Sequence, residues 1–339
     1  MQRPQPPFMN SEETLPPQHK ILRLPPNMDA VVYAQYGSPD VLSVTQVKSP
    51  TPTPDQVTIR VHSAGVNPID YRLRKGQAKW LLPGHFPRIP GYDVAGEVVF
   101  APADSGMKPG DRVMAFLDSR YGGGYAEYAC CHPTSVAPIP PGMSFDDAAA
   151  LPLAGSTALQ SLRDHGKLQS GDSVLINGAS GGVGAFAVQI AKAYGATVTG
   201  VASGENEAFV RSLGADEFMD YTETDFTKLD RTWNLVFDAA GKSDYFSSHS
   251  VLADNGHYVS TEPDFSGAMI SVLTKFLSKQ GTIMLANPDA DDLHELIRLY
   301  EQGQLKVVLD DVIEMSEATA AHQKIQNGVD RGKLVLRVK

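Results

Sequence analysis

The pattern of apolar positions along the chain changes near residue 150. Between Met28 and about Ala149, short apolar runs such as "MDAVVYAQY", "QVTIRVHSAGV" and "DVAGEVVFAP" are separated by turn signals such as "TPTPD" and "KPGD". This spacing predicts a β-rich unit. The next stretch, "FDDAAALPLAGSTALQSL", is rich in alanine and leucine and predicts helix.

Strand-like and helical patterns then alternate as far as about Gln302. The strand-like runs are "SVLIN", "ATVTGVA", "EFMDY", "NLVFDAA", "GHYVST" and "GTIMLA", and a helix is expected after each of them. Such alternation predicts a doubly wound α/β domain, in which helices cover both faces of a parallel sheet.

We therefore expect three parts: a Pro-rich arm at 1–27, a β-rich domain at 28–149 completed by 303–339, and a doubly wound domain at 150–302. The completion rests on the terminal run "KLVLRVK", which predicts a strand that rejoins the first domain. The arm holds seven prolines and two acids, Glu12 and Glu13, a composition unlike that of a secretory signal or an organelle transit peptide.

A glycine-rich turn follows the first strand of the doubly wound domain. The stretch "NGASGGVG", residues 177–184, has four glycines and stands between a strand pattern and a helix pattern. In that context, backbone N–H groups and the positive end of the helix are expected to bind a pyrophosphate. The alternative is a turn without a ligand.

The end of the second strand distinguishes NAD from NADP. A NAD site normally has an acidic residue about 20 residues after the glycines, whereas this chain has "GVASGENE" there. The Ser203 hydroxyl can donate to a 2′-phosphate, which a carboxylate would repel. Glu205 either opposes that phosphate or complements a helix dipole. The pattern favours NADPH.

Composition narrows the partners and the compartment. A formal charge of −10 argues against nucleic acid and anionic membranes as partners. No apolar run is long enough to predict a membrane span. The two cysteines, Cys130 and Cys131, are adjacent, so neither a structural disulfide nor a four-cysteine zinc site is expected, and a cytoplasmic location is the simplest prediction.

Eight stretches between Met28 and Lys339 carry a family resemblance: "AGVNPIDYRLRKG", "IPGYDVAGEVV", "KPGDRVMAF", "GGGYAEYA", "ALPLAGSTALQSL", "NGASGGVGAFAVQIAKAYGA", "FVRSLGADEFMDY" and "GKLVLRV". With them the chain resembles zinc-independent medium-chain dehydrogenases/reductases of the quinone oxidoreductase branch. It is particularly similar to chloroplast quinone-oxidoreductase homologues and alkenal/alkenone reductases. The resemblance implies a GroES-like catalytic domain, a Rossmann domain, a cofactor in the cleft between them, and a homodimer that pairs the edge strand "GTIMLA".

The resemblance also implies a set of cofactor contacts. Ser180, Gly181, Gly182 and Val183 would line the pyrophosphate, Thr157 would lie near the nicotinamide, Ser203 and Tyr221 would reach the 2′-phosphate, and Ala240 would sit near the nicotinamide ribose. Gly204 departs from the pattern, because many relatives have a lysine in that turn. The NADPH prediction therefore lacks one expected positive charge.

Metal chemistry is not expected. Zinc alcohol dehydrogenases of this fold hold the metal with a cysteine and a histidine where this chain has Asn67 and Tyr92. A catalytic zinc needs about three protein ligands, which Asp93 alone cannot supply. Without a Lewis acid to polarise an alcohol, oxidation of alcohols is not expected as the main reaction.

We expect hydride transfer from NADPH to a quinone or to the carbon–carbon double bond of an enal or enone. Negative charge then develops on the carbonyl oxygen, and Asn67 and Tyr71 are candidate catalytic donors to it. The alternatives are that Asn67 only makes a turn, with Asp70 capping the next helix, and that Tyr71 only packs. A pathway-specific enoyl or ene reductase and a non-enzymatic NADPH-binding protein also fit the sequence.

Overall fold

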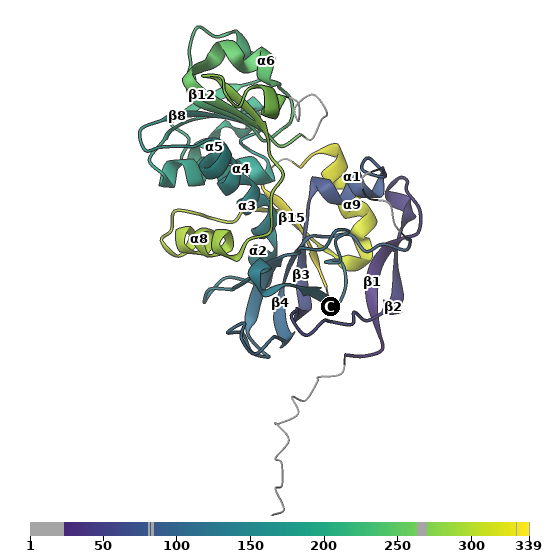
Figure 1. Ribbon diagram of the computed structural model, residues 1–339. Coiled ribbons are helices and arrows are strands. Elements are labelled where there is room, and N and C mark those ends of the chain that lie inside the picture. The colour runs from purple at the N-terminus through teal and green to yellow at the C-terminus, as the bar shows by residue number, and fades with distance from the viewer. Residues whose placement is uncertain (1–23, 81, 83–84, 263–269, 330, 339) are drawn as a thin grey trace, which may run out of the picture.

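The computed structural model describes residues 24–80, 82, 85–262, 270–329 and 331–338, so most of the arm expected at 1–27 lies outside the described residues. The described chain forms two units (Figure 1). The first unit combines the N-terminal and C-terminal segments, drawn in purple, blue and yellow, and the second is built from the middle of the chain. No described helix is both long and apolar enough to cross a membrane.

A seven-stranded sheet in the order β14-β15-β3-β4-β5-β7, with β6 beside β3, is the core of the first unit. A separate antiparallel pair, β1 and β2, lies beside it (Figure 1). The elements of this unit are β1 (Asn27–Tyr33), β2 (Leu42–Lys48), β3 (Val57–Val66), α1 (Pro68–Arg74), β4 (Asp93–Phe100), β5 (Arg112–Phe116), β6 (Tyr128–Cys131), β7 (Val136–Pro138), β14 (Leu309–Glu314), α9 (Ala318–Asn327) and β15 (Lys333–Arg337).

The C-terminal strand β15 lies between β14 and β3 in this sheet. It pairs antiparallel with β3, where Leu334 faces Val66, and parallel with β14. Leu334 and Leu336 are fully buried, and burying such a side chain contributes about 1.5–3 kcal/mol. The C-terminal segment is therefore part of the β-rich unit, while the domain boundaries themselves stay a prediction.

A six-stranded parallel sheet in the order β10-β9-β8-β11-β12-β13 forms the second unit. The chain runs outward from β8 to β10 and returns to β11 on the other side of β8, which creates a switch point beside β8. Its elements are α3 (Pro152–Gln160), β8 (Ser173–Asn177), α4 (Gly182–Ala193), β9 (Thr197–Ala202), α5 (Glu207–Ser212), β10 (Glu217–Asp220), β11 (Trp233–Asp238), α6 (Tyr245–Ser248), β12 (Leu252–Ser260), β13 (Gln280–Ile283) and α8 (Ala290–Glu301). Helix α2 (Phe145–Ala150) precedes them and packs against β3 and β4 of the first unit.

The helix expected between "EFMDY" and "NLVFDAA" is absent from the described chain: the segment holds only a 3₁₀ turn, Phe226–Lys228. Polar side chains explain the difference. The Asp225 carboxylate accepts hydrogen bonds from the backbone N–H and the hydroxyl of Thr227, and Asp220 does the same for Thr222. These local bonds stabilise turns at the expense of helix.

The alanine-rich stretch folds as two helices rather than one. Helix α2 ends at Ala150 and α3 begins at Pro152, whose missing N–H is tolerated only in the first helical turn. The break leaves the Leu153 N–H free to donate to the Asp93 carboxylate of β4, at 2.8 Å. It thus ties the start of α3 to the β-rich unit.

Candidate cofactor and active site

The turn between β8 and α4 has the shape of a phosphate cradle. Gly178 has a φ of +86°, and a Cβ on Gly184 would lie 2.0 Å from the Gly178 carbonyl oxygen, so both positions require glycine. Helix α4 begins without a side-chain cap, which leaves its first N–H groups for another acceptor. A Cβ on Gly181 would meet its nearest atom only at 3.5 Å, so there is room in front of the helix.

The C-terminal segment packs against this turn. The Gly332 N–H donates to the Ser180 carbonyl at 3.0 Å, and a Cβ on Gly182 would lie 2.8 Å from Cδ of Lys333. Ser180, Gly181, Gly182 and Val183, all predicted to bind pyrophosphate, thus lie together at the junction of the two units.

The other predicted cofactor residues follow neighbouring strands. Ser203 comes after β9, Tyr221 after β10, where it is 61% exposed, and Ala240 after β11. Because carboxyl ends of parallel strands share one edge, these side chains lie along the edge that carries the glycine turn. Thr157 is buried on α3, and its hydroxyl donates to the Leu153 carbonyl at 2.6 Å.

Arg331 adds a positive charge to the Ser203 end of this edge. Its Nε donates to Asn206 Oδ1 at 2.8 Å and its Nη2 to the Glu205 carbonyl at 3.1 Å. Asn206 Nδ2 donates in turn to Ser203 Oγ at 3.0 Å. Sequence reasoning missed Arg331 because 125 residues separate it from Asn206. The sequence feature that could have pointed to Arg331 is its position just before the terminal run "KLVLRVK", which was predicted to rejoin the first domain.

Asn67 lies in a buried polar network between the units. Its Nδ2 donates to Asp93 Oδ2 at 2.8 Å, and its Oδ1 accepts a hydrogen bond from Lys333 Nζ. Lys333 Nζ also donates to the Val66 carbonyl at 3.1 Å and lies 3.9 Å from Asp93 Oδ2. Burial raises the pKa of Asp93 to about 6 although Lys333 opposes the shift, and burial lowers the pKa of Lys333.

Asp70 holds the turn from β3 into α1. Its carboxylate accepts from the backbone N–H of Asn67 at 2.8 Å, the N–H of Gly91 at 3.1 Å and the hydroxyl of Tyr125 at 3.0 Å. Burial raises the pKa of Asp70 to about 7, although the Asn67 N–H and the Tyr125 hydroxyl favour the charged form. Tyr71, the next residue of α1, is half-buried, with the Lys75 ammonium 5.5 Å from its ring centre.

An ion pair crosses between the two units. Arg72 Nη2 of α1 lies 2.6 Å from Glu262 Oε2, just after β12. Glu262 also lines a cavity of about 160 Å³ at the carboxyl ends of β11, β12 and β13, which begins at Gly241, next to Ala240. This cavity is placed where the nicotinamide end of a cofactor on this edge would lie.

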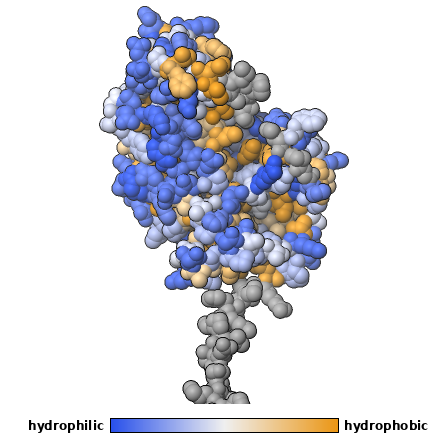
Figure 2. All heavy atoms as spheres, viewed as in Figure 1, coloured by the Kyte–Doolittle hydropathy of each residue, from blue (hydrophilic) through white to orange (hydrophobic). Residues whose placement is uncertain are grey.

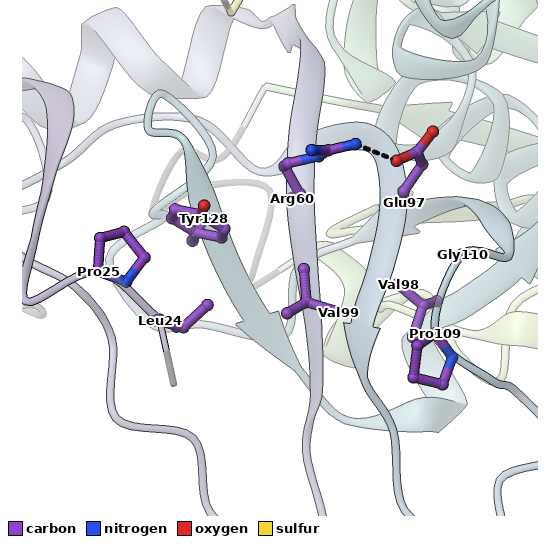
Figure 3. Close-up of a pocket in the computed structure, with 9 residues that line it drawn as sticks. All are labelled: Leu24, Pro25, Arg60, Glu97, Val98, Val99, Pro109, Gly110 and Tyr128. Carbon is purple, nitrogen blue, oxygen red and sulfur yellow. Dashed lines mark hydrogen bonds and ion pairs between the residues drawn. The ribbon is translucent and has the colours of Figure 1, made fainter. Parts of the chain in front are cut away.

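A second hollow, of about 270 Å³, lies on the β-rich unit (Figure 3). Its apolar wall faces the Arg60–Glu97 ion pair, and Leu24, where the described chain begins, closes one side. None of the residues predicted to bind cofactor lines it.

Comparisons with known proteins agree with this arrangement. Models of an "Alcohol dehydrogenase GroES-like domain" and of a "Zinc-binding dehydrogenase" match residues 53–141 and 213–336. The chain is 34% identical over 322 residues to the chloroplastic quinone-oxidoreductase homologue of Spinacia oleracea, covering 91% of this chain and 98% of that one. The chain belongs to the quinone oxidoreductase-like medium-chain dehydrogenases/reductases.

Other relatives of this quinone oxidoreductase-like protein include the NADPH-dependent alkenal/one oxidoreductase of Arabidopsis thaliana chloroplasts, 35% identical over 297 residues, with 85% of this chain and 73% of that one covered. The quinone oxidoreductase structure from Coxiella burnetii is 34% identical, with a TM-score of 0.85 and coverage of 92% and 100%. The prediction of a GroES-like domain plus a Rossmann domain is confirmed. The protein is thus an oxidoreductase of a family that binds nicotinamide cofactors.

The zinc-ligand positions of this quinone oxidoreductase-like protein hold other side chains. Asn67 bonds Asp93 and Lys333, and the Tyr92 hydroxyl donates to the Arg120 carbonyl at 3.1 Å. Within the described residues, no three His, Cys, Asp or Glu side chains are grouped so that they could hold a metal ion.

Proposed function

We propose that the protein is an NADPH-dependent oxidoreductase that reduces quinones or the carbon–carbon double bond of enals and enones. The observation that carries the proposal is that residues suited to binding a dinucleotide follow one another along one edge of the sheet. They run from Tyr221 and Arg331 through the glycine turn to Ala240. Relatives named quinone-oxidoreductase homologue and NADPH-dependent alkenal/one oxidoreductase support the acceptor class.

The described residues fit such a cofactor. The open space over Gly181 and the uncapped start of α4 suit a pyrophosphate held by Ser180, Gly181, Gly182 and Val183. Ser203, Tyr221 and Arg331 would hold the 2′-phosphate. The Ser203 hydroxyl now donates to the Glu205 carboxylate at 3.2 Å and would turn to the phosphate, while Arg331 is held by the Glu205 carbonyl. Ala240 and Thr157 would flank the nicotinamide ribose and ring.

When bound, NADPH supplies a hydride, which carries two electrons. In an enone the hydride forms a C–H bond at the β-carbon, and the π electrons of the double bond shift to leave negative charge on the carbonyl oxygen. Asn67 would donate an amide N–H to that oxygen, and Tyr71 would deliver the proton that completes the α-carbon. A quinone takes up the hydride and one proton and becomes a hydroquinone.

Steady-state oxidation of NADPH by a panel of quinones, enals and enones tests the proposal. We expect turnover with some of these electron-poor acceptors, and little with saturated aldehydes or with simple alcohols and NADP⁺. If none of the acceptors is turned over although NADPH binds, the protein is a nucleotide-binding protein rather than a reductase.

We further propose that the activity needs no zinc. Asn67 and Tyr92 cannot replace the cysteine and histidine ligands of the zinc enzymes, and both are engaged in other hydrogen bonds. Activity should therefore persist in a strong chelator, with no stoichiometric metal by elemental analysis. Stoichiometric zinc together with loss of activity on chelation contradicts this proposal.

We also propose a homodimer in a reducing compartment such as the cytoplasm. Strand β13 ends the row of six strands and is flanked by exposed apolar side chains, a surface that a second copy can cover. Cys130 and Cys131 are both free thiols. The plant relatives carry chloroplastic names, so imaging a fluorescent fusion of the full chain tests the compartment directly.

A further inference from the structure

We propose that Lys333 is a positioning residue that orients the Asn67 amide and strengthens it as a hydrogen-bond donor to the reacting carbonyl oxygen. The proposal rests on the proposed function, because it concerns the oxyanion formed as the hydride arrives. It assigns a role to a lysine of the C-terminal strand β15, which sequence reasoning did not include in the active site.

Lys333 is held in one place by both units. The residue is 4% exposed, and its ammonium donates to the Asn67 amide oxygen and to the Val66 carbonyl of β3. Its aliphatic stem lies over Gly182, at the start of α4, where a Cβ would come within 2.8 Å of Cδ. The cation therefore stands between the cofactor turn and Asn67.

The donor and acceptor chemistry allows one orientation of the amide. An ammonium has only hydrogens to donate, so Asn67 Oδ1 must face Lys333. Asp93 Oδ2 lies on the other side and accepts from Nδ2 at 2.8 Å. Flipping the amide would place Nδ2 against the ammonium and Oδ1 against the carboxylate, so both neighbours oppose it. Nδ2 has a second hydrogen, and in the proposed reaction this is the one donated to the substrate oxygen.

The charge of Lys333 also polarises the amide. A cation on Oδ1 draws electron density from the amide and makes its N–H groups stronger donors, and the effect is larger where water is excluded. Asn67 and Lys333 are both almost fully buried. The carboxylates that face this ammonium are those of Asp93, 3.9 Å away, and of Asp70, which acts on it through its charge. A negative charge at the substrate would thus be stabilised by a positive group acting through Asn67.

Two other roles are compatible with the same contacts and predict different results. Lys333 can merely neutralise the buried Asp93 carboxylate, or its ammonium can bind the cofactor pyrophosphate directly. In the first case Lys333→Met lowers stability, and Asp93→Asn in the same chain restores both stability and activity. In the second case Lys333→Met weakens NADPH binding.

A double-mutant cycle separates these roles. Wild type, Lys333→Met, Asn67→Ala and the double variant are compared by kcat with saturating quinone or enone, by NADPH affinity from fluorescence titration, and by melting temperature. Because the lysine acts through Asn67, Lys333→Met should lower kcat about tenfold in the wild-type background and less than about twofold in the Asn67→Ala background. The affinity for NADPH should change by less than about threefold.

Two controls keep the result interpretable. Lys192→Met removes a lysine that pairs with Asp216 at the far end of α4, so kcat should stay near the wild-type value. Lys333→Met with Asp93→Asn removes the uncompensated carboxylate, and kcat should stay low if orientation of Asn67 is what was lost. That variant also stands in for Lys333→Met if the single variant does not fold.

The outcomes distinguish failure of the proposed function from failure of the proposed role of Lys333. Absence of wild-type turnover with every acceptor overturns the proposed function and this inference together. Wild-type turnover with independent, multiplying effects of Lys333→Met and Asn67→Ala overturns this inference alone. Restoration of kcat by Asp93→Asn, or a loss confined to NADPH affinity, does the same.

Discussion

At the residue scale, Arg331 tests how the 2′-phosphate is recognised. Arg331→Met should raise KM for NADPH about tenfold, because a hydrogen bond to a charged group contributes about 1.5–3 kcal/mol. KM for NADH, which lacks the phosphate, should change less than about twofold. Steady-state kinetics with both cofactors provides the measurement. The control is Arg231→Met, since Arg231 pairs with Glu217 at the start of β10, at the opposite sheet edge. If KM rises equally for NADPH and NADH, Arg331 only holds the C-terminal segment in place.

Asp70 makes the free energy of unfolding depend on pH. Burial raises its pKa from 3.8 to about 7, so between these pH values the folded protein binds the proton that the unfolded chain releases. The contribution of Asp70 to the free energy of unfolding has its full value below about pH 4 and is lost as pH rises through about 7. Asp93, whose pKa is raised to about 6, acts in the same direction. His322, whose pKa burial lowers to about 3, acts in the opposite direction, so the test compares two proteins.

We expect the stability advantage of wild type over Asp70→Asn to shrink by about 2 kcal/mol between pH 5 and pH 8. The asparagine variant keeps the shape of the side chain but does not titrate. Urea unfolding of both proteins across this range measures the difference. If the free energies of unfolding of the two proteins change with pH in parallel, Asp70 is already ionised in the folded protein at pH 5.

At the element scale, the β8–α4 turn offers a matched pair of glycines. Gly184→Ala places a methyl group 2.0 Å from the Gly178 carbonyl oxygen, so backbone must move, and overpacking of this kind costs about 1–3 kcal/mol of stability. Gly181→Ala meets nothing nearer than 3.5 Å and should unfold like wild type. Its methyl group nevertheless enters the space in front of α4, so NADPH affinity should fall about fivefold or more. Unchanged NADPH affinity in Gly181→Ala would place the pyrophosphate elsewhere.

The sequence predicted correctly those elements whose structure depends on residues close together along the chain. The strands of the parallel sheet, the glycine turn and the residues at the strand ends follow from apolar runs and from glycine placement within a few residues. The helix expected after β10 was wrong because Asp220 and Asp225 stabilise turns through side-chain hydrogen bonds, which an apolar-spacing argument does not register. Lys333 and Arg331 were missed because only the pairing of β15 with β3 brings them beside Asn67 and Asn206.

At the scale of the whole molecule, that same strand connects the two units. The Gly332 N–H donates to the Ser180 carbonyl of the glycine turn, the stem of Lys333 lies against Gly182, and Arg72 pairs with Glu262. The Arg72–Glu262 pair is partly exposed, so it contributes at most about 1 kcal/mol. The buried contacts at the start of β15 are therefore the stronger link, and the candidate donor Asn67 is bonded by a residue from the far end of the chain.

The edge strand β13 of the six-stranded sheet is the surface through which the proposed dimer would form. Leu273, Phe276 and Leu285 are 66%, 90% and 67% exposed near β13, and Figure 2 shows hydrophobic side chains gathered on this unit beside the grey segment. If β13 pairs with its copy, these side chains become buried, so light scattering should give about twice 36.5 kDa. Leu273→Asp with Phe276→Asp should yield monomers, because each buried carboxylate would lack a partner. Val44→Asp, on exposed β2, is the control and should leave the mass unchanged. A wild-type mass of 36.5 kDa excludes the dimer.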